Sequence, residues 1–193
     1  MNDRSNIRAE PPPGLAALMA RAGDAAPKRP VEKWNPPYCG EIDMRIAADG
    51  TWHYLGTPIA REALVRLFAS ILRREPDGRH VLVTPVERIG IAVADAPFLA
   101  VEIHVEGAGC DQCLTFRTNM GDVVEAGSAH PIRFALERDT GGLKPYVDVR
   151  SGLEALATRP VALEIAALAQ HRDGKAGVCS GGAFFAFPES SDG

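Results

Sequence analysis

The segment Ile42-Asp-Met-Arg-Ile-Ala-Ala-Asp-Gly-Thr-Trp-His-Tyr54 decides how the fold is interpreted. Its first apolar residues, Ile42, Met44 and Ile46, alternate with polar ones, which is the period of a half-buried strand. An Asp-Gly pair supplies a turn, and the Trp-His-Tyr sequence continues the alternation on a returning strand. The segment therefore predicts a β-hairpin.

An amphipathic helix is predicted immediately after this hairpin. Thr57 is a suitable N-cap and Pro58 suits the first helical position. Apolar residues then recur with the spacing of one helical face, at Leu64, Leu67, Phe68, Ile71 and Leu72. The Pro-Asp-Gly sequence at 76–78 is expected to end the helix.

The rest of the chain is typical of short strands joined by turns. Apolar runs predict strands at 81–83, 89–93, 98–105, 114–118, 123–124, 132–136 and 146–149. Residues 153–156 predict a short helical piece, Pro160 opens a second helix to about Gln170, and 184–187 form either a strand or a packed tail. Because hairpins dominate, we expect antiparallel sheets and the α+β class.

The composition excludes several classes of protein. Of the 193 residues, 46% are apolar and 24% are charged, with a net charge of −4, which indicates a globular chain and no field for nonspecific nucleic-acid binding. No run of 18 apolar residues is available to span a membrane, and the first residues lack the apolar core of a signal peptide. We therefore expect a cytoplasmic protein.

Prolines indicate the domain organisation. Seven of the 15 prolines lie in the first 37 residues, which predicts a proline-rich arm over 1–36 with a short helix at Leu15, Leu18 and Met19. This helix packs on its own globule, docks on a protein partner, or is disordered. We expect two α+β halves, at 37–98 and 99–193, each too small to be very stable alone and packed against the other.

Two sequence echoes point weakly to an internal repeat. Residues 50–56 and 121–127 each carry two glycines that flank a predicted strand, and a Pro-Ile pair follows each of them. A second echo relates 97–102 to 160–164. Hairpin turns alone would give similar glycines, so chance and duplication both explain the pattern.

Cys110-Asp-Gln-Cys113 is the short motif with a recognised chemistry. Two thiols at this spacing chelate zinc or form a redox pair. A structural zinc site needs two further ligands, however, and here the motif precedes a strand, so unreactive loop cysteines are the alternative. Signature motifs for nucleophilic, phosphate-binding and zinc-dependent catalysis are absent from the sequence. We expect no cofactor and no metal, and the sequence favours a protein without enzyme activity over an enzyme.

Polar residues at the ends of elements are the candidates for ligand binding. Guanidinium forks suit phosphate or carboxylate groups, a tyrosine can stack on a ligand, and an Asn-containing turn can offer backbone N–H groups. Thr84-Pro-Val-Glu87 has a capping-box pattern, which makes this segment either a capped connector or part of a cleft. The candidates are Arg61, Glu87, Arg88, Asn119, Arg133, Tyr146 and Arg150. Surface ion pairs and ordinary turns are the alternative.

Several phrases together resemble the bacterial domain-of-unknown-function family 1285. They are Trp34-Asn-Pro-Pro-Tyr-Cys-Gly40, Gly50-Thr-Trp-His-Tyr-Leu-Gly-Thr-Pro-Ile-Ala-Arg61, Leu82-Val-Thr-Pro-Val-Glu-Arg88 and Pro145-Tyr-Val-Asp-Val-Arg-Ser-Gly-Leu-Glu-Ala155. The resemblance implies a duplicated α+β core with a C-terminal half like a pleckstrin-homology fold. It also implies a ligand site between the halves, for a nucleotide-like molecule, and a role in signalling.

Three functions follow from these observations. The first is a non-catalytic ligand-binding or signalling module for a nucleotide-like or other anionic small molecule. The second is a thiol redox or metal-binding protein that uses Cys110 and Cys113. The third is an adaptor that binds a protein partner through its N-terminal arm.

Overall fold

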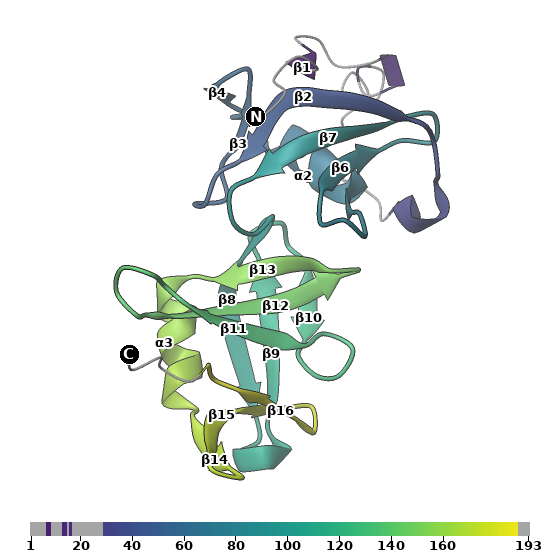
Figure 1. Cartoon of the computed structure of the whole chain (residues 1–193). Helices are drawn as coiled ribbons and strands as arrows, with labels where there is room; N and C mark the ends of the chain where they lie inside the picture. Colours follow the sequence, from purple (N-terminus) through teal and green to yellow (C-terminus); the bar gives the residue numbers. More distant parts are fainter. Residues whose placement is uncertain (1–6, 9–12, 15, 17–28, 189–193) are drawn as a thin grey trace. The chain divides into compact units, whose positions relative to one another are not determined.

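The computed structural model describes residues 7–8, 13–14, 16 and 29–188 (Figure 1). The predicted helix at Leu15, Leu18 and Met19 lies outside these described residues. The chain divides into two units, residues 1–95 and 96–193, so the division falls slightly before the predicted one at 98/99.

The first unit contains a seven-stranded sheet in the order β4-β3-β2-β7-β6-β5, to which a short strand β1 adds beside β2. The hairpin prediction is confirmed, because Ile46 pairs with Trp52 and Met44 with Tyr54 in antiparallel register. The elements are β1 (Ile7–Arg8), the 3₁₀ helix η1 (Val31–Lys33), β2 (Tyr38–Ile46), β3 (Trp52–Tyr54), β4 (Thr57–Pro58), α2 (Glu62–Ile71), β5 (Leu72–Arg74), β6 (His80–Val83) and β7 (Arg88–Val93).

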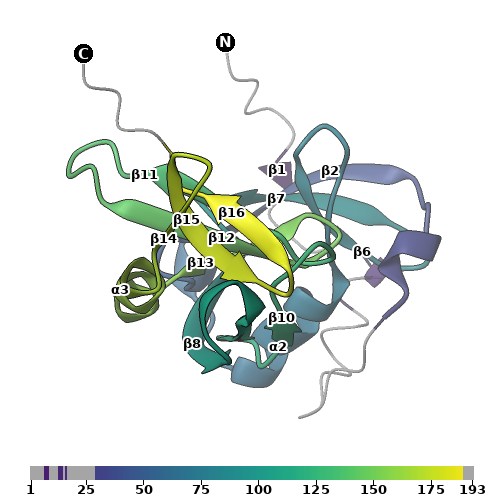
Figure 2. The ribbon, with the colours of Figure 1, turned by 90° about the horizontal axis from the view of Figure 1, so that it is seen from below.

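The second unit contains a six-stranded sheet in the order β10-β9-β8-β13-β12-β11 and a separate three-stranded sheet in the order β14-β15-β16. Figure 2 shows the three strands of the smaller sheet side by side. The elements are β8 (Phe98–Glu106), the 3₁₀ helix η2 (Gly109–Asp111), β9 (Cys113–Thr118), β10 (Val123–Glu125), β11 (Ile132–Leu136), β12 (Leu143–Arg150), β13 (Leu153–Ala157), α3 (Arg159–Ala167), β14 (Gln170–Arg172), β15 (Lys175–Ser180) and β16 (Ala183–Ala186).

The two units repeat one topology. In each, three successive strands form one meander, three more form a second, and the first strand of the first meander lies beside the last strand of the second. That central pairing is parallel, between β2 and β7 and between β8 and β13. The short strand β1 also pairs with β2 in parallel, so the expectation of purely antiparallel sheets is wrong at these three pairings. The described part of the chain is mostly β, with two α-helices.

The repeat does not follow the sequence echoes. Residues 50–56 contain β3, the second strand of the first meander in its unit, whereas 121–127 contain β10, the third strand of the corresponding meander. The second echo relates the strand β8 to the helix α3. Similar turns and apolar spacing produced both echoes, so the duplication is visible in the order of strands and not in those phrases.

Three predicted helical segments are strands. The helix that was predicted to end at 76–78 ends at Ile71, and Leu72–Arg74 form β5. Thr57 and Pro58 form β4, which pairs with β3, and the helix begins only after Arg61. Proline is tolerated in β4 because this strand lies at the edge of the sheet, where a missing N–H removes no ladder bond. Residues 153–156 belong to β13, in which Leu153, Ala155 and Ala157 are buried alternately.

Each unit has its own apolar core. In the first unit α2 packs on the sheet through Phe68, whose ring stacks on Trp52 with centroids 5.9 Å apart. In the second unit α3 buries Val161 and Ile165, and Phe98 and Phe116 fill the interior. No described helix is long and apolar enough to cross a membrane.

A buried serine fastens the small sheet to the large one in the second unit. The Ser180 hydroxyl accepts a hydrogen bond from the Leu114 N–H at 2.9 Å and donates one to the Ala126 carbonyl at 2.7 Å. At the other end, the Phe187 ring packs edge-on against Phe134 of β11, with centroids 4.8 Å apart. The small sheet is thus attached near β9 and β10 and also at β11.

Candidate functional site

Two cationic side chains gather around one tyrosine in the second unit. Arg133 on β11 lies directly opposite Tyr146 on β12, and its guanidinium carbon is 4.0 Å from the centre of the tyrosine ring. Lys144 precedes Tyr146 by two residues on the same strand, so both side chains leave the same face, and its Nζ is 5.6 Å from the same ring. The ring is 5% exposed, although it lies on the outer face of the sheet.

Glu154 on β13 completes this cluster. The Nε–H and Nη2–H groups of Arg133 donate to the two carboxylate oxygens of Glu154 at 2.8 and 2.9 Å. These bonds raise the pKa of Arg133, against the opposing effect of partial burial. The fork is thus occupied by a carboxylate in the bidentate geometry that phosphates and carboxylates share.

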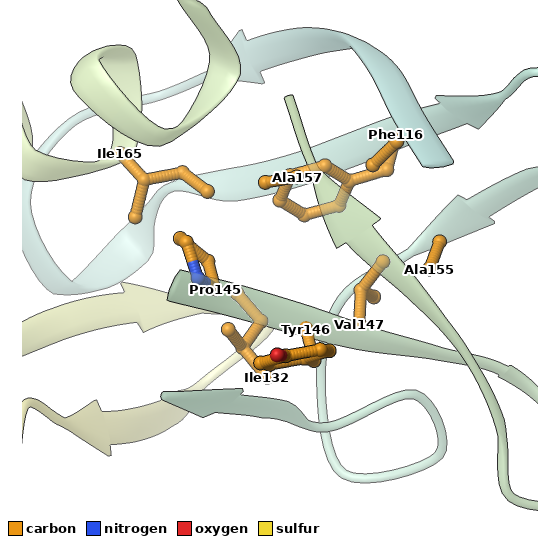
Figure 3. A pocket seen from close by; sticks show the side chains of 9 residues that line it. Phe116, Ile132, Pro145, Tyr146, Val147, Ala155, Ala157 and Ile165 are labelled. Atoms are coloured by element: carbon orange, nitrogen blue, oxygen red, sulfur yellow. The ribbon is translucent and has the colours of Figure 1, made fainter. Parts of the chain in front are cut away.

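An apolar hollow lies on the inner side of the same strands. Figure 3 shows side chains from several strands and from α3 converging on it. The hollow leaves no room for a water-sized molecule. It is a packing gap, so the outer face around Tyr146 is the better candidate for a ligand. The residues that line the hollow are Ala100, Phe116, Ile132, Pro145, Tyr146, Val147, Ala155, Ala157 and Ile165, so Tyr146 borders the hollow as well as the outer face.

The predicted residues Arg150 and Asn119 have other neighbours in this unit. The Nη1 of Arg150 is 3.2 Å from the Asp122 carboxylate, and its guanidinium lies 4.9 Å from the centre of the Phe98 ring. Asn119 is bound to Leu99: its side-chain oxygen accepts the Leu99 N–H at 3.0 Å, and its own N–H donates to the Leu99 carbonyl. These contacts fix the turn between β9 and β10 to β8.

The candidates in the first unit lie in or next to segments that are held by hydrogen bonds and ion pairs. Glu87 is buried at the connection from β6 to β7, where its N–H donates to the Thr84 hydroxyl at 3.2 Å. This bond is the cap that the pattern predicts, and a role of Glu87 and Arg88 in a cleft stays a prediction. Arg88 begins β7 and contacts the Glu75 carboxylate at 3.1 Å. Arg61 is the exposed residue that precedes α2.

Sequence reasoning missed the ion cluster of which Arg88 is part. Arg73 donates twice to Glu75, at 2.8 and 2.6 Å, and also to the carbonyls of Val31 and Trp34. This cluster ties η1 and the segment after it to β5. The helix predicted to end at 76–78 would include Arg73, which lies on β5 instead, and nothing in the local pattern indicated its partners far along the chain.

The cysteines lie in different surroundings. Cys110 lies beside Cys179 of β15, with the two Sγ atoms 2.9 Å apart. Cys113 begins β9, and its pKa is raised by burial and then by the neighbouring Glu125. Within the part of the chain that the structure describes, no group of three or more His, Cys, Asp or Glu side chains is arranged to hold a metal ion.

Comparisons with known proteins identify relatives for most of the chain. Residues 29–96 match the family described as "Domain of unknown function (DUF1285), N-terminal domain", and residues 97–187 match "Protein of unknown function (DUF1285), C-terminal domain". A crystal structure of a protein of this family from Silicibacter pomeroyi DSS-3 is 50% identical, with a TM-score of 0.85, and the match covers 93% of this chain and 97% of that one.

A second crystal structure, of a protein from Shewanella baltica OS155, is 30% identical with a TM-score of 0.49. That match covers 64% of this chain and 90% of the other. No curated protein matches the chain.

Proposed function

The chain belongs to the DUF1285 family, and from that premise we propose that it is a non-catalytic binding or signalling module. Its ligand is an anionic small molecule, held on the outer face of β11, β12 and β13. Arg133 and Lys144 supply the positive charge, and Tyr146 orients the Arg133 guanidinium. A nucleotide-like ligand would bind there through its phosphate groups.

The observation that carries this proposal is the occupied fork of Arg133. Glu154 occupies this guanidinium in a bidentate geometry, which a phosphate group can also adopt, and this supports an anion as the ligand. Because the side chains of Arg133 and Glu154 are 53% and 22% exposed, the pair lies within reach of solvent. A ligand anion would take the place of Glu154, which acts as an internal counter-ion in its absence.

The tyrosine supports this interpretation. A guanidinium stacked on an aromatic face gains about 0.5–1 kcal/mol at an exposed site, and it loses part of its freedom before a ligand arrives. Lys144 adds a second cation at the same ring. The Tyr146 ring itself is 5% exposed, so we assign it a role in positioning Arg133 and not in stacking on a nucleobase.

The remaining expectations from the sequence go beyond what these contacts support. A pleckstrin-homology-like second half and the α+β class stay predictions, which the helix α3 after the last strand of the large sheet favours. The ligand site between the halves and the adaptor function of the arm also stay predictions.

Binding of inorganic pyrophosphate and of ADP to the full chain, measured by isothermal titration calorimetry and thermal shift, tests the proposal. We expect Arg133→Gln to abolish binding and Glu154→Gln to tighten it up to about fivefold, since an exposed ion pair contributes at most about 1 kcal/mol. Arg66→Gln is the matched control, because Arg66 forms an exposed ion pair with Glu62 within the first unit.

Two results would contradict the proposal. One is the lack of stabilisation by either probe at millimolar concentration, because a ligand of the native state must raise its stability. The other is equal affinity of the wild-type protein and Arg133→Gln, which would mean that the anion binds elsewhere.

A further inference from the structure

Two cysteines that are distant along the chain meet in the second unit. Cys110 belongs to η2 and is exposed, whereas Cys179 belongs to β15 and is buried. Their Sγ atoms are 2.9 Å apart, and 69 positions separate them in the sequence. A disulfide needs about 2.05 Å between sulfurs, so a shift of less than about 1 Å would allow the bond.

Hydrogen bonds hold the two cysteines beside each other. Gln112, which is 2% exposed, donates its side-chain N–H to the Cys179 carbonyl at 2.9 Å. The N–H of Gly181 donates to the Gln112 carbonyl at 3.1 Å. The backbone two residues after each cysteine is thereby anchored to the other segment, so the contact between the thiols is part of the fold.

We propose that Cys110 and Cys179 form a reversible disulfide by exchange with a small-molecule disulfide of the glutathione type. This site differs from the Cys110–Cys113 pair that the sequence suggested. It is also independent of the proposed anion site, because it involves none of the residues around Tyr146.

The exchange takes place in two steps. First, the Cys110 thiolate attacks one sulfur of the small disulfide, which forms a mixed disulfide and releases one small thiolate. Next, the Cys179 thiolate attacks the Cys110 sulfur, which forms the protein disulfide and releases the second small thiolate. The two protein thiols lose two electrons and two protons in total, and the small disulfide becomes two thiols.

Exposure sets this order of attack. Cys110 reaches solvent on the 3₁₀ turn, whereas the pKa of Cys179 is raised by burial and then by the neighbouring Cys110. A buried thiol with a raised pKa is a poor first nucleophile but suits the intramolecular second step, in which its target is already in contact. The buried side of the pair also resists larger oxidants.

The bond would link two parts of the second unit that are otherwise held together by hydrogen bonds. Cys110 lies in the connection between β8 and β9, and Cys179 lies in the small sheet of β14, β15 and β16. Oxidation would therefore lock the small sheet onto the large one, and reduction would leave it attached through contacts such as those of Ser180.

The test is incubation of the full chain with glutathione disulfide, followed by mass spectrometry of the intact protein and of its tryptic peptides. Cys113→Ser and Cys39→Ser are the matched controls. Cys110 and Cys113 share the tryptic peptide 89–117, and Cys179 lies in 176–193, so the Cys113→Ser protein assigns the bond without ambiguity.

We expect the wild type and both control variants to lose two hydrogen atoms and to yield peptide 89–117 linked to 176–193. Cys179→Ser, and Cys179→Ala as a second variant, should stop at one glutathione on Cys110. The proposal is overturned if the link persists in Cys110→Ser. It is equally overturned if the bond joins Cys110 to Cys113, or if the wild type yields mixed disulfides alone.

Discussion

Removal of the Ser180 hydroxyl tests how the small sheet is held. This hydroxyl is fully buried, and it connects the Leu114 N–H to the Ala126 carbonyl across the edge of the large sheet. Ser180→Ala keeps the size of the side chain nearly unchanged, so the perturbation is the loss of two hydrogen bonds and not the opening of a large cavity.

The expected cost follows from what the variant leaves behind. A buried polar group that loses its partner costs about 1–3 kcal/mol, and here an N–H donor and a carbonyl acceptor are both affected. The carbonyl has a second lone pair, which limits its share. We therefore expect Ser180→Ala to lower the free energy of unfolding by about 2–4 kcal/mol.

Urea unfolding followed by far-UV circular dichroism measures this loss. The tryptophans are in the first unit, so their fluorescence does not report on the second unit directly. Peptide-level hydrogen exchange adds a local readout, because the Leu114 amide should lose protection.

Ser70→Ala is the matched control. Its hydroxyl donates to the Leu67 carbonyl one turn earlier in α2, and alanine's higher helix propensity offsets that loss. We expect a change within about 0.5 kcal/mol. An equally small change in Ser180→Ala, with unchanged protection of Leu114, would refute the reasoning.

Three further predictions concern pH, packing and oxidation. Burial, and then the positive charge of Arg74, lowers the pKa of His80 in the folded state from its usual 6.5. The unfolded state therefore binds this proton more tightly, so the free energy of unfolding should fall as the pH drops below about 6.5. The fall should be smaller in His80→Gln. Gly177→Ala would push a methyl group into the Phe185 carbonyl oxygen, so we expect the free energy of unfolding, measured with urea, to fall by more than about 2 kcal/mol. Formation of the Cys110–Cys179 bond should stabilise the chain by up to about 4 kcal/mol through the restricted unfolded state, measured as the difference between oxidised and reduced protein.

Each of these predictions has a control. His171→Gln, which replaces an exposed histidine of the second unit, is the control for the first. Gly127→Ala should be tolerated, because its methyl would meet its nearest neighbour at an ordinary 3.8 Å. Cys113→Ser should keep the full difference in free energy of unfolding between the oxidised and the reduced protein. A pH profile that is the same in His80→Gln, a Gly177→Ala protein as stable as the wild type, or an oxidised form no more stable than the reduced one would contradict the respective prediction.

The local elements could be predicted from sequence because their signals are local. The alternation from Ile42 to Ile46 and the Asp-Gly turn were sufficient for the first hairpin, and the apolar stripe of α2 identified the helix. The start of that helix was wrong because Thr57-Pro58 suits an edge strand as well as an N-cap.

Tertiary context decided the segment 153–157. Its leucine, glutamate and alanines have high helix propensity, yet the sheet requires a strand there, and Leu153, Ala155 and Ala157 face the core. The indication of a strand in this segment was the alternation of Leu153, Ala155 and Ala157 with other residues. Because alanine is small and only weakly apolar, that alternation is hard to recognise. The parallel joins had no local signal, since a period of two indicates which face is buried and not which strand is adjacent.

The candidate site was predictable only in part. Arg133 and Tyr146 were both among the residues predicted, and the structure places one over the other. Glu154 was not among the predicted residues, because the sequence does not indicate which of its many carboxylates pairs with Arg133. For the same reason Cys110 was paired with the nearby Cys113 and not with Cys179, which only the fold brings beside it.

The parallel join between the first and last large-sheet strands of each unit governs how the chain can reach its native state. Phe98 pairs with Ala155, and Tyr38 pairs with Arg88, so neither central pairing can form from a short stretch of chain. Contacts so distant in sequence slow folding, because the loop entropy is lost before the pairing is gained. During synthesis, each large sheet must therefore wait for its last strand to leave the ribosome. Until then its two meanders present unpaired central edges, and each unit is most prone to aggregation just before it is complete.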